Sequence, residues 1–349
     1  IKGKKSYRCK ESPESIYCLK AISRHIRKLY KIKPSSRDSI NRQIKNYLDD
    51  GFGYDLLRTD IKSFFESISH DVLINILKSK GLLSQHSMKI IRRLLSDHER
   101  KTGLRIGIPR GLSISSDLAE IYMAKIDSQI KSIEGVVFYA RYVDDIIVIR
   151  APNFATKGLD ILNVIEKICE GNQLSLNEAK THNYKWNSGA SSSKINYLGF
   201  TYFLHKNRGK VDISTDRFDR YKKRIDQCFE IFNNRGNLRQ KEASKWLVRR
   251  IKFLTTNTRL DFSKENAHTG IFFNNSLISD NSKQIQNLDK YLQSKIKAID
   301  DDHKWLKSTL GKLTFETGFS ARTFSSFTSA RNGKRANMLK KITDTWKYD

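Results

Sequence analysis

The sequence is poor in residues that cross-link a chain or bind zinc. It has four cysteines among 349 residues, at Cys9, Cys18, Cys169 and Cys228. They are scattered and form no CxxC pair, so we expect free thiols in a reducing compartment. The eight histidines show no HExxH or other zinc spacing. These absences argue against a disulfide-stapled fold and against a zinc site.

The sequence also lacks long apolar runs. No run approaches the roughly 18 apolar residues that span a membrane, and no segment has the pattern of a signal peptide. We therefore expect no membrane partner and a cytoplasmic location. The first residue is Ile1 and not Met, so part of the natural sequence is expected upstream.

Acidic residues are too few to balance the basic ones. The chain has 65 Lys and Arg against 37 Asp and Glu, a net charge of +28. Residues 1–50 contribute +9, residues 51–204 only +4 and residues 205–349 the remaining +15. A near-neutral middle between basic ends suits surfaces that hold a phosphate backbone. A merely soluble basic surface is the alternative.

Apolar periodicity predicts a mixture of helices and strands. The expected helices cover residues 13–32, 37–48, 70–80, 84–97, 115–133, 154–169, 215–234, 238–256 and 282–308. The expected strands cover residues 54–61, a hairpin at 138–149, and residues 181–186 and 194–204. The composition changes to long basic helices beyond residue 205, so the main domain boundary is expected at 205–215.

The hairpin at 138–149 carries two adjacent carboxylates, Asp144 and Asp145, between apolar, β-branched runs. The pattern predicts a tight turn that displays both acids, although hairpin turns also contain Asp for backbone reasons alone. Apolar strands predict burial, and buried carboxylates need a partner or a metal. Adjacent acids repel each other unless a divalent cation reverses the local electrostatics. A hard cation such as Mg²⁺ is therefore expected.

A third acid, Asp60, ends the expected strand 54–61. If this strand neighbours the hairpin, Asp60 and Asp144 can share two divalent ions. In-line nucleotidyl transfer requires this arrangement, because one metal activates the attacking 3′-hydroxyl and the other binds the triphosphate and the leaving pyrophosphate. Such chemistry needs mainly positioning and charge neutralisation, so carboxylates suffice.

Five motifs in this order resemble the palm of reverse transcriptases, the RNA-directed DNA polymerases. They are DIKSFF (60–65), GIPRGLSIS (107–115), YVDD (142–145), LNEAKT (176–181) and NYLGF (196–200). The resemblance implies an α+β right-hand polymerase with compact fingers, an antiparallel-sheet palm and a basic helical thumb. The implied domains are residues 1–53 for the N-terminal helical fingers, 54–213 for the palm with finger insertions, and 214–349 for the thumb and C-terminal region.

The resemblance also implies roles for single residues of the catalytic centre. Asp60, Asp144 and Asp145 would be catalytic and would bind two Mg²⁺ ions, with the Ile61 carbonyl as a further ligand and Mn²⁺ as a substitute metal. Lys180 matches the lysine that can protonate the leaving pyrophosphate. An ordinary surface lysine is the other interpretation.

Further implied roles concern the nucleotide and the primer. Phe65 matches the steric gate that excludes a 2′-hydroxyl and so selects dNTPs, whereas Phe64 is expected in the core. Arg110 and Gly111 would contact the nucleotide, and Arg110 stands where many relatives have glutamine, so an ionic contact is expected there. The matching primer grip consists of Tyr197, Leu198, Gly199 and Phe200.

The basic helices offer candidates for nucleic-acid binding. The clusters there consist of Lys222, Lys223 and Arg224, and of Arg249 and Arg250. Each cluster is equally compatible with a solvated helix face. The candidates for binding triphosphate are Arg37, Arg42 and Arg58.

The Pro-Arg-Gly-Leu form of the second motif, the compact fingers and the basic tail look most like bacterial defence-associated, abortive-infection reverse transcriptases. That group implies a bacterial cytoplasm, antiviral defence, an RNA template or noncoding RNA, dNTPs, a DNA product, and room for a second copy or another protein subunit. Four alternatives stay open. They are a group II intron-type maturase, a template-independent terminal transferase, an RNA-dependent RNA polymerase and a nucleic-acid-binding scaffold without catalysis.

Overall fold

The structure is a computed structural model. It describes residues 6–7, 13–33, 35–50, 52–151, 160–185, 193–204, 210–234, 239–259, 268–279, 281–325 and 334–346. Contacts divide the chain into two compact units. The first consists of Ile1–Gln43 and Gly51–Ala190, and the second of Ile44–Asp50 and Ser191–Asp349, so helix α2 (Arg37–Asp49) supplies residues to both. The three-part domain division inferred from the sequence stays a prediction.

The first unit contains a four-stranded antiparallel sheet in the order β2-β3-β1-β4. Its strands are β1 (Asp55–Asp60), β2 (Val136–Tyr142), β3 (Asp145–Arg150) and β4 (His182–Lys185). Every residue of β3 after Asp145 is buried. Burial on both faces explains why β3 appears in the sequence as a near-continuous apolar run instead of an alternating one.

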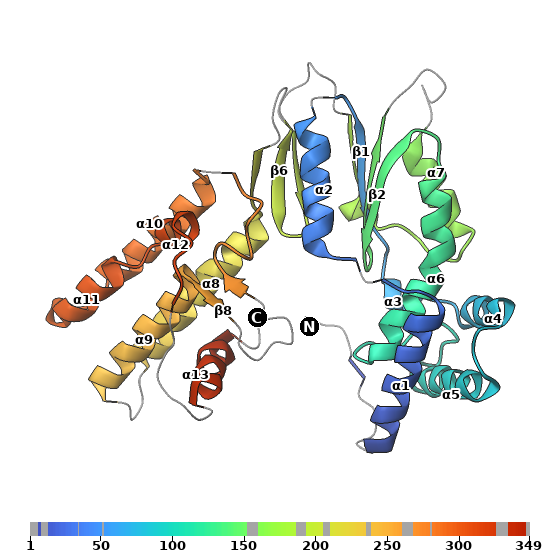
Figure 1. Cartoon of the computed structure of the whole chain (residues 1–349), viewed down its shortest axis with the longest axis horizontal. Helices are drawn as coiled ribbons and strands as arrows, with labels where there is room; N and C mark the ends of the chain where they lie inside the picture. Colours follow the sequence, from blue (N-terminus) through green and yellow to red (C-terminus); the bar gives the residue numbers. More distant parts are fainter. Residues whose placement is uncertain are drawn as a thin grey trace. The chain divides into compact units, whose positions relative to one another are not determined.

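The first unit also contains helices, some of them beside the sheet and others beyond one end of it (Figure 1). They are α1 (Pro13–Leu29), α3 (Phe64–Ser67), α4 (His70–Lys80), α5 (Gln85–Thr102), α6 (Ser113–Lys131) and α7 (Ile161–Glu170), with a 3-10 turn η1 (Glu178–Lys180). Helix α6 is the central one, since ten of its residues are buried. One of them, Asp117, accepts hydrogen bonds from Ser23 and from Arg27 of α1, the latter at 2.7 Å. This buried carboxylate therefore ties α1 to α6.

The second unit combines two small sheets with a group of helices. Its strands are β5 (Ser193–Tyr197), β6 (Phe200–Leu204) and β7 (Lys210–Ile213), which form one antiparallel sheet, and β8 (Asn257–Arg259) with β9 (His268–Gly270), which form another. Its helices are α8 (Thr215–Asn233), α9 (Gln240–Thr255), α10 (Lys283–Lys297), α11 (Lys304–Gly311), α12 (Phe315–Ser320) and α13 (Lys334–Thr343), with 3-10 turns η2 (Asp301–His303) and η3 (Asp344–Trp346). Figure 1 shows α8 and α9 side by side.

Two expected elements were wrong. The strand expected at 194–204 is a hairpin, because Leu198 and Gly199 both take positive φ, 44° and 87°, as a two-residue hairpin turn requires. The helix expected at 282–308 ends at Lys297 and a new helix begins at Lys304. Three consecutive aspartates at 300–302 are unfavourable at a helix C-terminus, where the dipole is negative, and favour the start of the next helix instead.

The remaining expected helices and strands differ from the observed ones mainly at their ends, whereas α3, β7, β8, β9, α12 and α13 were not expected. Helix α5 extends five residues beyond the expected limit, to Thr102, and α6 begins two residues earlier, at Ser113. Helix α7 begins at Ile161 after an Asp160 N-cap, and residues 154–159 of the expected helix lie outside the described part of the chain. The α+β fold class inferred from the sequence is confirmed by these mixed helices and antiparallel sheets.

Two properties expected from composition can be checked in the described residues. Cys18, Cys169 and Cys228 are free there, and Cys9 lies outside them. No helix among the described residues has both the length and the apolar character needed to cross a membrane.

Candidate active site

The turn between β2 and β3 holds Val143 in a conformation that β-branched residues avoid. Its φ is 63°, in the left-handed region. The buried Arg141 supports this turn by donating from its guanidinium to the Val143 carbonyl at 2.9 Å. Arg141 is itself fixed by ion pairs with Glu120 and Asp127 at 2.7 and 2.9 Å. A rigid ionic network thus maintains the strained turn that presents the two aspartates.

The three predicted acids converge at this corner of the sheet. Strand β1 pairs with β3 so that Asp60 lies directly opposite Asp145. The Ile61 amide donates to the Asp144 carbonyl at 3.0 Å, which joins the end of β1 to the turn. Asp60 is only 5% exposed, whereas Asp144 and Asp145 are half-buried. The neighbouring strands that the sequence argument required are therefore present.

The electrostatics of the corner disfavour the charged carboxylates. Burial, followed by the negative charge of Asp60, raises the pKa of Asp144 above its ordinary value. Burial also raises the pKa of Asp145, while the nearby Arg58 opposes that effect. Burial is therefore the main reason why both carboxyl groups resist ionisation.

Three side chains already bind these acids. The Lys180 ammonium donates to Asp60 Oδ2 at 2.9 Å, and the Asn177 amide donates to Asp60 Oδ1 at 3.2 Å. The Arg58 guanidinium donates to Asp145 Oδ1 at 3.3 Å. Arg58 was expected to bind triphosphate, but in this structure it pairs with Asp145.

The carboxylates at this corner of the sheet are candidate ligands for a divalent cation. Within the described part of the chain, no three His, Cys, Asp or Glu side chains are arranged to hold a metal ion. The donors nonetheless fit a hard cation in their chemistry, because they are carboxylates and Asp60 raises the pKa of Asp144, as a shared negative site would. Asp60 and Asp144 are therefore the residues that would hold such an ion.

The gate candidate Phe65 lies in α3, directly after the fully buried Phe64. The Arg110 guanidinium lies over the Phe65 ring, 4.8 Å from its centroid. The same guanidinium donates from Nε and from its second terminal nitrogen to the two carboxylate oxygens of Glu66, at 2.6 and 2.8 Å. Arg110 therefore binds Glu66 within the protein, and its expected ionic contact with a template or nucleotide stays a prediction.

Backbone hydrogen bonds attach the loop before α6 to α3 and to Ile68, the residue that follows α3. The Gly107 amide donates to the Ile68 carbonyl at 2.7 Å, and the Ile108 amide donates to the Phe65 carbonyl at 2.8 Å. Gly111 has a φ of 95°, and a Cβ there would lie 2.9 Å from the Tyr7 carbonyl oxygen. Glycine is therefore required at 111, by both its conformation and this close approach.

Lys180 permits a direct test of its predicted role. Lys180→Arg keeps a cation that can pair with Asp60, but a guanidinium does not release its proton. If Lys180 donates a proton to pyrophosphate, Lys180→Arg should lower the single-turnover rate of nucleotide addition about a hundredfold. Lys167→Met, which removes an α7 lysine outside this corner, is the control. A wild-type rate for Lys180→Arg would exclude proton donation.

The predicted primer grip forms the turn between β5 and β6 in the second unit. Tyr197 and Phe200 are buried, and Leu198 and Gly199 form the turn. Arg217 packs over the Phe200 ring at 4.4 Å and donates to the Leu198 carbonyl at 3.3 Å. The turn is thus held by a cation that the sequence argument did not consider.

The basic residues expected to bind nucleic acid differ in their surroundings. Arg224 and Arg250 are half-buried against the C-terminal segment, where Arg224 lies 5.7 Å from the Trp346 ring centroid and Arg250 donates to the Thr345 hydroxyl at 3.0 Å. Arg249 lies over the Trp246 ring at 5.0 Å. Lys222 lies 4.8 Å from the Tyr291 ring centroid, and Lys223 is exposed. Arg224 and Arg250 therefore have a role in packing the C-terminal segment.

Because reversing the charge of Arg224 or Arg250 would disturb packing against the C-terminal segment, the charge-reversal test of nucleic-acid binding uses Lys222 and Lys223. Lys222→Glu with Lys223→Glu should weaken RNA binding and reduce the slope of log K against log salt by about 2, because two phosphate contacts are lost. The matched control is Lys78→Glu with Lys80→Glu, which makes the same charge change on exposed residues of α4. Equal slopes for the two double variants would show that Lys222 and Lys223 are only a solvated face.

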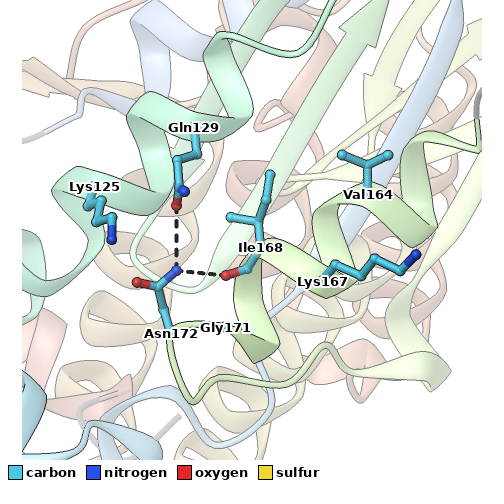
Figure 2. A pocket seen from close by; sticks show the side chains of 7 residues that line it. All are labelled: Lys125, Gln129, Val164, Lys167, Ile168, Gly171 and Asn172. Carbon is cyan, nitrogen blue, oxygen red and sulfur yellow. Dashed lines mark hydrogen bonds between the residues drawn. The ribbon is translucent and has the colours of Figure 1, made fainter.

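A surface hollow of about 360 Å³ lies between α6 and α7 (Figure 2). Asn172 spans it, donating to the Gln129 side chain at 3.5 Å and to the Ile168 carbonyl at 2.7 Å. Its lining contains Lys125 and Lys167 but none of the acids of the corner. The hollow is therefore separate from the candidate active site.

Three residues make contacts in the site that were not predicted from the sequence. Arg141 next to the YVDD turn, Asn177 and Glu66 all stand within or beside the motifs. Their proximity to the motifs was the available signal, but nothing in their spacing specified a partner. The described structure assigns Arg141 to the Val143 carbonyl, Asn177 to Asp60 and Glu66 to Arg110.

Comparisons with known proteins give a family and several distant likenesses, of which three are described. A stretch of 85 residues is 34% identical to an "Uncharacterized 91 kDa protein in cob intron" of Schizosaccharomyces pombe, covering 23% of this chain and 10% of that protein. Apo telomerase from Candida tropicalis is 13% identical, with a TM-score of 0.48, over 95% of this chain and 53% of that one. Telomerase from Candida albicans with a TWJ fragment of telomeric RNA is also 13% identical, with a TM-score of 0.47, over 94% and 50%.

The chain thus spans about a tenth of the length of the intron protein and about half of the length of each telomerase. The family model described as "Reverse transcriptase (RNA-dependent DNA polymerase)" matches residues 16–202. This match extends over more than half of the chain and includes all five sequence motifs. The chain therefore belongs to the reverse transcriptase (RNA-dependent DNA polymerase) family.

Proposed function

We propose that this protein polymerises dNTPs into DNA on an RNA template, adding each nucleotide to the 3′-hydroxyl of a primer. The observation that carries the proposal is the pairing of β1 with β3, which brings Asp60 opposite Asp145 and joins Ile61 to Asp144. The family description supports RNA as template and DNA as product. Phe65 is the proposed steric gate for the sugar.

Mg²⁺ is the proposed cofactor, as two ions, with Mn²⁺ as a substitute. Asp60 and Asp144 would hold the ions, with Asp145 and the Ile61 carbonyl contributing. When bound, the ions supply activation of the primer hydroxyl and neutralisation of the triphosphate and pyrophosphate charge. The chain's own contribution is to fix these oxygens on paired strands and to place Lys180, a cation with a transferable proton, 2.9 Å from Asp60.

The test is extension of a labelled primer on an RNA template of known sequence, with each dNTP omitted in turn. Templated synthesis predicts that extension stops at the first position that needs the omitted nucleotide. Extension regardless of the template would indicate a terminal transferase instead. Extension with NTPs alone would indicate an RNA polymerase, and the absence of any product with Mg²⁺ or Mn²⁺ would indicate a non-catalytic scaffold.

For the biological role, we propose antiviral defence in a bacterial cytoplasm, with a noncoding RNA as partner. Its support is the Pro-Arg-Gly-Leu sequence at 109–112 together with the basic C-terminal part. Sequencing the nucleic acid that copurifies with the wild type and with Asp144→Asn tests this proposal. We expect one noncoding RNA in both preparations and DNA only in the wild type. A heterogeneous RNA population in both would contradict a dedicated noncoding RNA.

An intron-type maturase and reverse transcriptase is the second candidate. The observation that favours it is the 34% identity over 85 residues to a protein in a cob intron. The same sequencing experiment separates the two candidates, because a maturase would retain a spliced or unspliced intron RNA. A second copy or another protein subunit is proposed as a further partner in either case, and the mass of the purified complex would reveal it.

A further inference from the structure

The contacts of Arg110 with neighbouring side chains indicate a task other than contact with a template or nucleotide. We propose that Arg110 is a positioning residue, which together with Glu66 fixes the ring of Phe65 and thereby sets the discrimination between dNTPs and rNTPs. This inference rests on the proposed function and deepens it. It assigns a part in sugar selection to the ion pair between Arg110 and Glu66, two residues that are 44 positions apart in the sequence.

The contacts form a clamp around the gate. Two parallel charge-assisted hydrogen bonds hold the Arg110 guanidinium on Glu66, the residue directly after Phe65. The same guanidinium lies 4.8 Å from the Phe65 ring centroid. On another side, Phe64 meets the Phe65 ring edge-on, with centroids 5.5 Å apart. The ring is thus contacted by a fixed cation and by a fully buried aromatic ring.

The gate needs such support because its own helix is short. Helix α3 has only four residues, too few to be stable by itself, and a partly exposed phenylalanine can exchange between staggered rotamers. A ring that rejects one additional hydroxyl group must be held to about 0.5 Å. A lysine at 110 could neither reach both Glu66 oxygens nor present a planar group to the ring, which explains the use of arginine.

The test measures the ratio of kcat/KM for a dNTP to that for the matching rNTP. Glu66→Gln, Arg110→Gln and the double variant should each lower the ratio about tenfold, the scale of one lost pocket constraint. The double variant should be no worse than either single variant, because the pair acts as one unit. Arg105→Gln, which removes an exposed ion pair of the same loop with Asp71 at 2.8 Å, is the control and should keep the wild-type ratio.

Other results would contradict the proposal that Arg110 and Glu66 position the Phe65 ring. If Arg110 instead binds the nucleotide, Arg110→Gln should raise KM for dNTP and rNTP alike, while Glu66→Gln leaves the ratio unchanged. A wild type that makes no DNA would contradict the proposed function itself. A wild type that makes DNA, with Glu66→Gln at the wild-type ratio, would contradict the clamp alone.

A second inference comes from the other unit, where rings gather at the surface. His268 and Phe273 are stacked, with centroids 4.8 Å apart, and Phe324 meets both rings at 5.5 and 5.7 Å. Arg322 lies over Phe272 at 4.3 Å. We name these five residues the aromatic cluster. His268 and Arg322 are exposed, and Phe324 is 51% exposed.

A buried asparagine holds the cluster rigidly. Asn257 is fully buried, and its amide donates to the carbonyls of Gly318 and Thr323, both at 3.0 Å. Its side-chain oxygen accepts from the Phe272 amide at 2.9 Å. The segments that present the rings are therefore tied to one residue, so that little conformational entropy is lost when a ligand binds.

We infer that the aromatic cluster binds bases of single-stranded nucleic acid by stacking. Exposed ring faces beside cations are the usual combination for single strands, and the segments 268–279 and 321–325 contain Arg322 but no acidic residue. Residues 205–349, which contain them, carry +15 of the net charge. A polyanion with exposed bases satisfies both features, whereas a protein partner would use the rings alone.

The experiment compares a single-stranded RNA with the same strand in which abasic sites replace the bases, using the full chain. Phe324→Ala should weaken binding of the normal strand about tenfold and leave the abasic strand unaffected, since only the normal strand has bases that can stack on the ring. The matched control is Trp305→Ala, which removes a 60% exposed aromatic residue outside the cluster. Equal affinity of wild type and Phe324→Ala for the normal strand would overturn the inference. So would loss of a copurifying protein with RNA binding unchanged.

Discussion

Asp144→Asn should abolish DNA synthesis, lowering the rate of primer extension at least about a thousandfold, because an amide replaces a carboxylate that would bind the metal ions. RNA binding should change little, since no phosphate-binding cation is removed. The two quantities are the single-turnover extension rate and the equilibrium affinity for the RNA template. Polymerisation that persists in this variant would contradict the proposed chemistry.

The same substitution also has an expected effect on stability. In the folded state burial and Asp60 raise the pKa of Asp144, so the ionised carboxylate is disfavoured relative to the unfolded chain. This cost is complete at pH values above the raised pKa, declines as the pH falls from the raised to the ordinary pKa, and is gone below the ordinary pKa. Asp144→Asn should therefore raise Tm at neutral pH without divalent ions. Asp97→Asn, at an exposed ion pair with Arg100, is the control for an aspartate outside the corner. A lowered Tm for Asp144→Asn would indicate general misfolding.

Phe65→Ala should admit ribonucleotides, raising rNTP incorporation relative to dNTP about a hundredfold, because the ring proposed to exclude the 2′-hydroxyl is removed. The measurement is kcat/KM for dNTP and rNTP on one primer and template. The Arg110–Glu66 ion pair does not depend on the ring, so the loop before α6 should remain in place.

Phe64→Leu provides the contrast for this prediction. Phe64 is fully buried in the core of the first unit, so the substitution should lower the free energy of unfolding by about 1–2 kcal/mol. It should change sugar discrimination far less than Phe65→Ala does, because the Phe65 ring itself is kept. A reversed outcome, with discrimination lost in Phe64→Leu and kept in Phe65→Ala, would place the gate at the wrong phenylalanine.

Local sequence patterns predicted the elements that depend on local forces. The apolar runs at 54–61 and 138–149 indicated strands, and turn chemistry placed Asp144 and Asp145 at a turn inside the second run. In the structure Asp144 lies in that turn and Asp145 is the first residue of β3. The break between α10 and α11 was missed, because apolar periodicity continues through residues 298–300 while backbone preferences of the aspartates end the helix. The turn at Leu198 was missed for a related reason, since leucine rarely takes a positive φ.

The sequence by itself determined the reaction class and the catalytic carboxylates proposed for it, because motif order, β-strand patterns and acids at strand ends are properties of short segments. Only the tertiary structure decided which cation each acid binds. Arg58 pairs with Asp145 across 87 residues, and Arg110 pairs with Glu66 across 44. Many arginines were equivalent candidates by charge alone. Which one reaches a given carboxylate depends on strand register and loop packing, which no local pattern specifies.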